Sequence, residues 1–209
     1  MIRCGFSDMR FKIKGISFEI TFLFAAFIAF ILSFRAPSNV LIAIFSSLFH
    51  ESWHLAAMLA VGNPPESVRL ELTGMNIKRM QSVKISIKNE LFISVCGPMA
   101  NAFAVVICII ALCFCENELI LSTACINLIL MIFNLLPVKR LDGGMVLYFL
   151  LSRKFDADFC SHILKITSIF FITVIYIWGI YVFIVSKYNF SVLIIAIFLT
   201  VSLFGSNEY

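Results

Sequence analysis

Two histidines and a glutamate lie together in an otherwise apolar stretch of the chain, in the order His50-Glu51-Ser52-Trp53-His54. Residues four apart in a helix project from the same face, one above the other. If this stretch is helical, both imidazoles can bind one metal ion, and Glu51 can reach a water molecule beside it. This order and spacing of residue types is that of a zinc site with a neighbouring general base.

The composition excludes an ordinary soluble globular protein. Apolar residues make up 61% of the 209 residues and charged residues 13%, whereas typical domains have about 45–50% and about 25%. The chain is therefore expected to cross a membrane several times, as one domain. The net charge of +4 does not indicate nucleic-acid binding, because the basic residues gather at the ends of the apolar stretches.

Six apolar stretches are predicted to span the bilayer, whose core requires about 20 residues in a helix. They cover residues 16–34, 39–61, 89–115, 119–136, 162–185 and 190–204. With the N-terminus in the cytoplasm, 14 of the 16 Lys and Arg residues lie on the cytoplasmic side, which leaves Arg35 and Lys187 outside. The positive-inside rule therefore predicts that both termini are cytoplasmic.

The sequence between the second and third spans has a different period. Apolar and polar residues alternate at 68–72, at 75–78 and at 83–88. Such alternation predicts about three half-buried strands within residues 68–88, in a small amphipathic sheet at the membrane surface. A substrate-binding role for these strands is a hypothesis: an exposed strand could bind an unwound substrate segment as a further strand.

A catalytic zinc ion usually has three protein ligands and one open position, so two histidines leave one ligand to be found. His162 begins an apolar stretch in a polar segment, which favours a position at the membrane surface. Asp142 is the better candidate, because it follows a helix broken by Pro137 and precedes two glycines that permit unusual backbone angles. The alternative is that Asp142 caps the short helix expected after it, at 145–152.

Three separated motifs resemble the site-2 protease family of intramembrane metalloproteases. They are His50-Glu51-Ser52-Trp53-His54, then Gly97-Pro98-Met99-Ala100-Asn101, and then Asn134-Leu135-Leu136-Pro137 followed by Leu141-Asp142-Gly143-Gly144. The resemblance covers about residues 40–150. The fold expected is an α-helical membrane protein of about six transmembrane helices, with the small sheet between the second and third. The layout is most similar to compact bacterial members, and among them to the sporulation-type branch.

The resemblance implies that His50, His54 and Asp142 bind one zinc ion and that Glu51 is the general acid/base. It also suggests that Asn134 positions the substrate or stabilises the oxyanion. The glycine, proline and asparagine of the second motif are expected to shape helix packing. One peptidase domain is expected over residues 1–209, with no PDZ-like or nucleotide-sensing domain.

The function expected from these features is hydrolysis of a peptide bond in or near a transmembrane segment of a membrane-tethered substrate. The expected location is a bacterial cell membrane, with an active site that opens toward the cytoplasm. The other partners are the lipid bilayer and a regulatory membrane protein of unknown identity. The alternatives are a catalytically inactive relative and a membrane transporter with a polar intramembrane site. The substrate, which could belong to sporulation, stress signalling or signal-peptide clearance, is left open.

Overall fold

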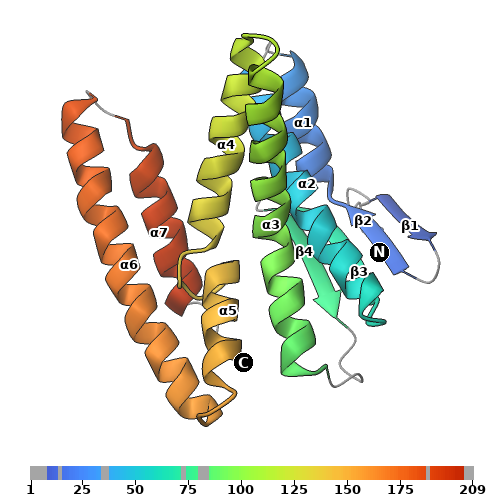
Figure 1. The fold of residues 1–209 in the computed structure, drawn as a ribbon, viewed down its shortest axis with the longest axis vertical. Coiled ribbons are helices and arrows are strands. Elements are labelled where there is room, and N and C mark those ends of the chain that lie inside the picture. The colour runs from blue at the N-terminus through green and yellow to red at the C-terminus, as the bar shows by residue number, and fades with distance from the viewer. Residues whose placement is uncertain are drawn as a thin grey trace, which may run out of the picture. The chain divides into compact units, whose positions relative to one another are not determined.

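The computed structural model describes residues 9–13, 16–33, 38–71, 74–79, 85–186 and 189–204. These residues form a mostly α-helical protein with one small four-stranded sheet (Figure 1). The chain divides into two compact units, Met1–Met131 and Ile132–Tyr209. The expectation of a single peptidase domain with its core at about residues 40–150 stays a prediction.

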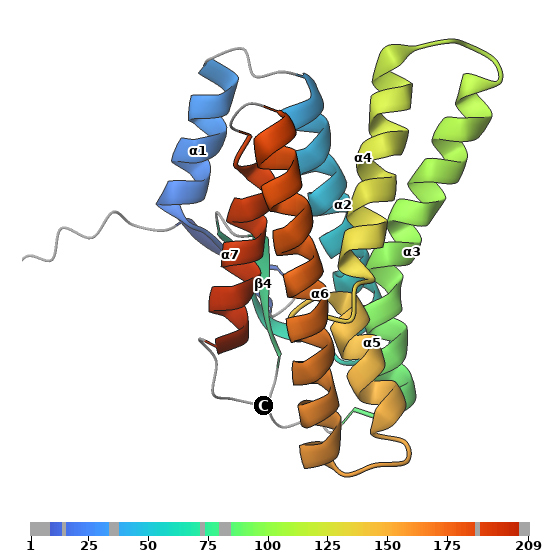
Figure 2. The same cartoon turned by 90° about the vertical axis from the view of Figure 1, so that its left-hand side faces the viewer.

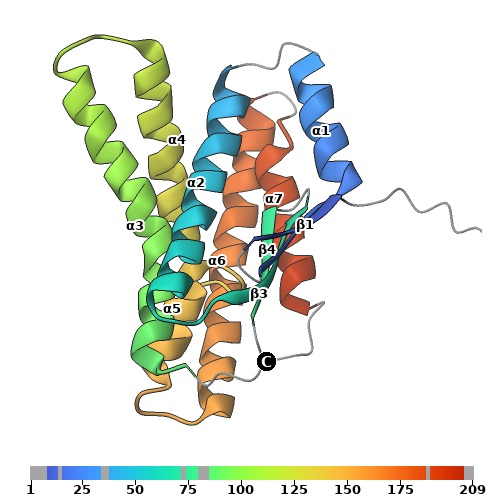
Figure 3. The ribbon, with the colours of Figure 1, turned by 90° about the vertical axis from the view of Figure 1, so that its right-hand side faces the viewer.

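The sheet belongs to the first unit, where Figure 3 shows its strands beside helix α2. Its order is β1-β2-β3-β4, with a parallel pair between β2 and β3 and antiparallel pairs on either side. The strands and the three helices that lie wholly in this unit are β1 (Met9–Ile13), β2 (Ile16–Ile20), α1 (Phe22–Ser33), α2 (Ser38–Ala60), β3 (Pro65–Glu71), β4 (Gly74–Arg79) and α3 (Ile87–Leu112).

Strand β2 corrects the first predicted span, which was expected to begin at Ile16. Residues Ile16–Ile20 alternate between apolar and polar side chains, and they form a strand before α1 begins at Phe22. Glu19 in this strand pairs with Arg10 at 2.9 Å and with Arg69 at 3.4 Å. The overall hydropathy of residues 16–34 concealed a short stretch with a period of two, which is the period of a strand.

The prediction of three strands within residues 68–88 is also corrected. The structure has two strands near this range, β3 and β4, and the other two strands of the sheet precede α1. The expected third strand lies partly in 80–84, outside the described residues. Its described end is helical, because Ser86 caps α3 and accepts a hydrogen bond from the Asn89 backbone N–H at 3.3 Å. A serine at this position stabilises the first turn of a helix.

Helices α2 and α3 pack against each other in the first unit and share a small apolar core with β4. Ala57 and Met58 of α2 contact Ile93 and Cys96 of α3, and Ile77 of β4 packs against them. Helix α4 (Glu118–Asn134) follows α3 after a short turn, as Figure 2 shows. The core fixes α2 against α3 immediately beyond His54, so it also fixes which residues of α3 face the histidines.

The second unit is built on α5 (Asp142–Leu151), α6 (Ala157–Val185) and α7 (Ser191–Phe204). Helices α6 and α7 run side by side in Figures 1 and 2. Their core joins Ile172 of α6 and Leu199 of α7 to Val138, which lies in the turn before α5 and is fully buried. This turn is therefore held by apolar contacts as well as by hydrogen bonds.

Three described helices are long and apolar enough to cross a membrane: α2, α3 and α6. The helices α4, α5 and α7 are apolar but shorter. Large apolar side chains cover the outer surface of α6, where Trp178 is 62% exposed and Ile184 is 70% exposed. A surface of this kind is costly in water and suits a lipid environment. The count of six spans stays a prediction.

Candidate metal centre

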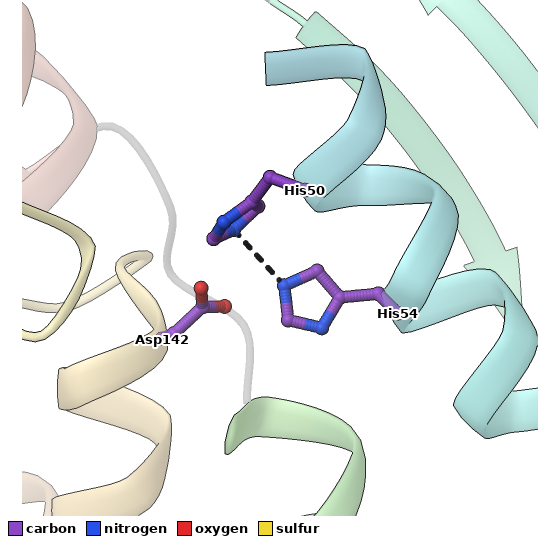
Figure 4. Close-up of side chains that lie close together, drawn as sticks. All are labelled: His50, His54 and Asp142. Atoms are coloured by element: carbon purple, nitrogen blue, oxygen red, sulfur yellow. Dashed lines mark hydrogen bonds between the residues drawn. The ribbon is translucent and has the colours of Figure 1, made fainter. Parts of the chain in front are cut away.

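The histidines project from one buried face of α2. Ser46, His50 and His54 are spaced four residues apart along this helix, and all three are buried. The two imidazole rings meet edge to face, with their centroids 4.9 Å apart and their Nε2 atoms 3.2 Å apart (Figure 4). The two Nε2 atoms can therefore serve as ligands of the same ion.

Helix α3 holds both rings through their other nitrogen atoms. The Nδ1–H of His54 donates to the carbonyl oxygen of Ile93 at 2.8 Å. The Nδ1 atom of His50 lies 3.1 Å from the side-chain nitrogen of Asn101. Histidines that bind metals generally use their second ring nitrogen in this way, which fixes the orientation of the ring. The hydrogen bonds thus orient both Nε2 atoms toward one point.

Gly97 provides the space that the two rings occupy. A Cβ atom at this position would lie 2.6 Å from His50 Nε2, 2.7 Å from His50 Cε1 and closer still to His54 Nε2. Gly97 also lies one helical turn beyond Ile93, where a side chain would help to cover the Ile93 carbonyl oxygen. Glycine in a helix interior costs about 1 kcal/mol relative to alanine, so this position has a specific structural reason.

Trp53 lies beside the buried histidine face of α2, about 100° around the helix from His54. Its side chain is 41% exposed, and its ring meets the ring of Phe49 edge to face with centroids 6.1 Å apart. The tryptophan therefore belongs to an aromatic pair on the outer surface of α2.

Asp142 begins helix α5 in the second unit, directly after a tight turn. Gly143 and Gly144 are helical, so the unusual backbone angles that glycine permits are not used at these positions. The described residues with positive φ are instead Arg140, at 76°, and Gly62, at 72°. The glycines are needed for close contact: a Cβ at Gly143 would lie 2.6 Å from the Leu136 carbonyl oxygen and closer to that of Leu135.

Ser168 of α6 holds the turn before Asp142 from the other side. Its hydroxyl accepts a hydrogen bond from the Lys139 backbone N–H at 2.8 Å and donates to the Leu164 carbonyl oxygen at 2.6 Å. Ser168 is fully buried, so these bonds replace contacts with water that the turn would otherwise need. The position of Asp142 within its unit is therefore set by α6 as well as by the turn itself.

The three predicted zinc ligands form a group that could hold a metal ion. His50 and His54 belong to the first unit and offer two imidazole nitrogens, and Asp142 belongs to the second unit and offers a carboxylate. Two imidazoles and one carboxylate are a donor set that zinc accepts in catalytic sites. The chemistry of these donors, the cleared space at Gly97 and the bonded Nδ1 atom of His54 all fit zinc.

The other candidate residues lie on α2, α4 and α6. Glu51 follows His50 on α2 and is half-buried, and Asn134 is the last residue of α4. His162 is exposed near the start of α6 and does not belong to the group of candidate ligands. This agrees with its expected position at a helix end.

Gly97 and Asn101 are functional candidates that sequence reasoning treated as packing residues. Asn101 is fully buried in a mostly apolar part of α3. A polar side chain in such a place is costly unless it has a partner, and this cost was the available signal. The partner itself, His50, lies 51 residues away in the chain and could be found only in the structure.

Three comparisons with known proteins bear on the family of this chain. The family model for peptidase family M50 matches residues 116–175. A zinc metalloprotease of Methanocaldococcus jannaschii is 30% identical over 163 residues, which are 72% of this chain and 47% of that protein. The chain thus spans about half the length of this curated relative.

The solved structure of a site-2 protease from Methanocaldococcus jannaschii has the same fold. It matches with a TM-score of 0.68 and 21% identity, over 97% of this chain and 96% of that one. The family model, the curated relative and the fold together support the resemblance of the three motifs, and the similarity to a zinc metalloprotease agrees with Zn²⁺ as the cofactor. The chain is thus similar to peptidase family M50 over residues 116–175 and has the fold of a site-2 protease.

Proposed function

We propose that the protein is an intramembrane zinc metalloprotease that hydrolyses a peptide bond in or near a transmembrane segment of a membrane-tethered substrate. The observation that carries this proposal is the pair of buried imidazoles on α2, with Nε2 atoms 3.2 Å apart. Both rings contact α3 through Nδ1, and Gly97 leaves room for them. The similarity to peptidase family M50 and to a zinc metalloprotease supports the same reaction class.

The proposed ligands are His50, His54 and Asp142, which offer the donor set that zinc requires. A zinc ion bound there would supply an activated water and polarise the peptide carbonyl. Glu51, one residue from His50, takes a proton from the attacking water and delivers it to the leaving amine. Asn134, at the end of α4, positions the substrate or stabilises the oxyanion.

The protein is integral to a membrane, and the finer layout is part of the proposal. Six spans with cytoplasmic termini in a bacterial cell membrane would place the sheet and the turn before Asp142 on the cytoplasmic side. The distribution of basic residues supports this layout, since 14 of the 16 would face the cytoplasm. Water would then reach the site from the cytoplasmic side.

The experiment that tests the function compares the wild type with Glu51→Gln. We expect Glu51→Gln to lower the rate of cleavage of a tagged single-span substrate by about 10²- to 10⁴-fold, because general acid–base catalysis contributes that much. Zinc content should stay at about one ion per chain, since Glu51 is not a proposed ligand. Cleavage is measured on gels with purified protein in vesicles, and zinc by atomic emission.

The matched control is Glu116→Gln, which removes an exposed carboxylate in the turn between α3 and α4. It should leave both cleavage and zinc content unchanged. Equal cleavage by the wild type and Glu51→Gln would contradict the proposed mechanism. A wild type that neither binds zinc nor cleaves would contradict the proposed function as a whole.

Strand β4 is the proposed site where an unwound substrate segment is held. The strand order places β4 at an edge of the sheet, where its outer backbone groups can pair with an added strand. We expect Lys78→Pro to lower cleavage of the single-span substrate by about tenfold, because proline cannot donate to an added strand. Zinc content should not change.

Two controls distinguish the effect of a proline at the β4 edge from the effect of losing the Lys78 side chain. Lys78→Ala removes the same exposed amine and its 3.6 Å contact with Glu66, so it isolates the effect of losing the charge. Lys12→Pro places a proline in β1, at the opposite edge of the sheet. Unchanged cleavage by Lys78→Pro, or an equal loss in Lys12→Pro, would argue against substrate addition at β4.

A further inference from the structure

Asn101 on α3 contacts a candidate zinc ligand, and its side chain is fully buried. The Asn101 Nδ2 atom lies 3.1 Å from the Nδ1 atom of His50. Within the described part of the chain, the Asn101 Oδ1 atom is buried and has no hydrogen-bond partner. This orientation of the amide leaves its oxygen unsatisfied, which is unfavourable in a buried place.

The contacts of the two imidazoles form a chain from Asn101 through His50 and His54 to the Ile93 carbonyl oxygen. The Ile93 carbonyl oxygen can only accept, so the proton of His54 is on Nδ1 and its Nε2 carries a lone pair. If the 3.2 Å contact between the two Nε2 atoms is a hydrogen bond, the proton of His50 is on Nε2. In turn, the Asn101 amide N–H donates to His50 Nδ1.

A metal ion bound by both Nε2 atoms requires a lone pair on each of them. His54 already meets this condition. His50 meets it only when its proton is on Nδ1, and this buried N–H then needs an acceptor. The Asn101 Oδ1 atom becomes that acceptor when the amide rotates by half a turn about its terminal side-chain bond. Nε2 loses one proton and Nδ1 gains one, so the imidazole stays neutral, and no backbone movement is needed.

We propose that Asn101 is a positioning residue that selects the tautomer of His50 able to bind zinc, by accepting a hydrogen bond from Nδ1–H through Oδ1. The inference rests on the proposed function and deepens it. The Oδ1 end of the amide has no bond among the described residues that would oppose the rotation. The amide group suits both arrangements because it offers a donor and an acceptor on the same carbon.

The test measures zinc affinity in the purified full-length protein, by competition with a chromophoric chelator. Asn101→Leu keeps a similar volume and removes the acceptor, so we expect zinc affinity to fall about 10- to 100-fold, as for other residues that orient a metal-bound histidine. Asn101→Asp provides an acceptor of the same shape and should keep affinity within a fewfold of the wild type. The visible absorption of cobalt-substituted protein should be retained in Asn101→Asp as well.

The matched control is Asn127→Leu. Asn127 is also a buried asparagine of the first unit, but its Nδ2 atom donates to Ser46 and to the Thr123 carbonyl oxygen, each at 2.9 Å. It should leave zinc affinity unchanged. A purely structural role of Asn101 predicts that Leu and Asp both weaken zinc binding through loss of folding. Equal affinity of Asn101→Leu and the wild type, or equal loss in Asn101→Asp and Asn101→Leu, would overturn the inference.

A second measurement on the wild type keeps the inference testable if a variant does not fold. Nitrogen NMR of ¹⁵N-labelled histidine should show that His50 carries its proton on Nδ1 once zinc is added, with exposed His162 as an internal reference. A zinc-loaded protein with Nδ1 of His50 deprotonated would overturn it. A wild type that binds zinc with the expected order of variants but cleaves nothing would contradict only the proposed function.

Discussion

Gly97→Ala should reduce zinc content from about one ion per chain to nearly none, and cleavage should be lost with it. The added Cβ would lie 2.6 Å from His50 Nε2 and closer to His54 Nε2, which is where a metal ion must be bound. The rings cannot move aside easily, because His54 is bonded to the Ile93 carbonyl and His50 to Asn101. Atomic emission of the purified protein measures the zinc.

A harmful effect of Gly97→Ala is unusual, because alanine is otherwise favoured over glycine in a helix interior by about 1 kcal/mol. Ser94→Ala is the matched control: Ser94 is buried one turn before Pro98, and its hydroxyl donates to the Glu90 carbonyl of its own helix at 2.9 Å. The control should keep zinc. A zinc-replete Gly97→Ala protein would show that the rings are not confined as the structure indicates.

Gly143→Ala should displace the start of α5 and lower the midpoint of thermal unfolding. The added Cβ would meet the carbonyl groups of Leu135 and Leu136, and backbone atoms cannot rotate away as a flexible side chain can. Overpacking of a tight contact typically costs about 1–3 kcal/mol. Because Asp142 is the proposed third ligand and the adjacent residue, zinc affinity should fall too. Unfolding in detergent and chelator competition measure the two effects.

Gly179→Ala, in the middle of α6, serves as the control for this change. A Cβ there would meet the end of the Leu193 side chain at 2.9 Å, and that side chain can shift. It should leave zinc affinity unchanged and alter stability far less. If Gly143→Ala behaves like Gly179→Ala, the close packing of α5 on the preceding turn is not what positions Asp142.

The boundaries of the helices were largely predictable from the sequence, and the first span shows where prediction failed. Helix α2, for example, was expected at 39–61 and extends over Ser38–Ala60. The stretch after Ile16 was expected to be helical from its apolar content, but Ile16–Ile20 pairs with β1 and β3. The parallel pair with β3 joins residues about 50 positions apart, and no local pattern encodes such a partner.

The sequence by itself determined the chemistry of the candidate site. The spacing of His50 and His54 follows from the covalent chain and the helical repeat, so it holds wherever the helix lies. The apolar stretches and the distribution of Lys and Arg likewise indicated a membrane protein before any tertiary contact was known. The motif order then indicated the family.

Only the tertiary structure decided how the histidines are held. The Ile93 carbonyl lies 39 residues from His54 and Asn101 lies 51 residues from His50, and these contacts depend on how α2 packs against α3. The same packing shows why position 97 is a glycine: a side chain there would occupy the space of the two histidine rings. Residue spacing determines which side chains share a face, but the contacts of that face depend on the neighbouring helix.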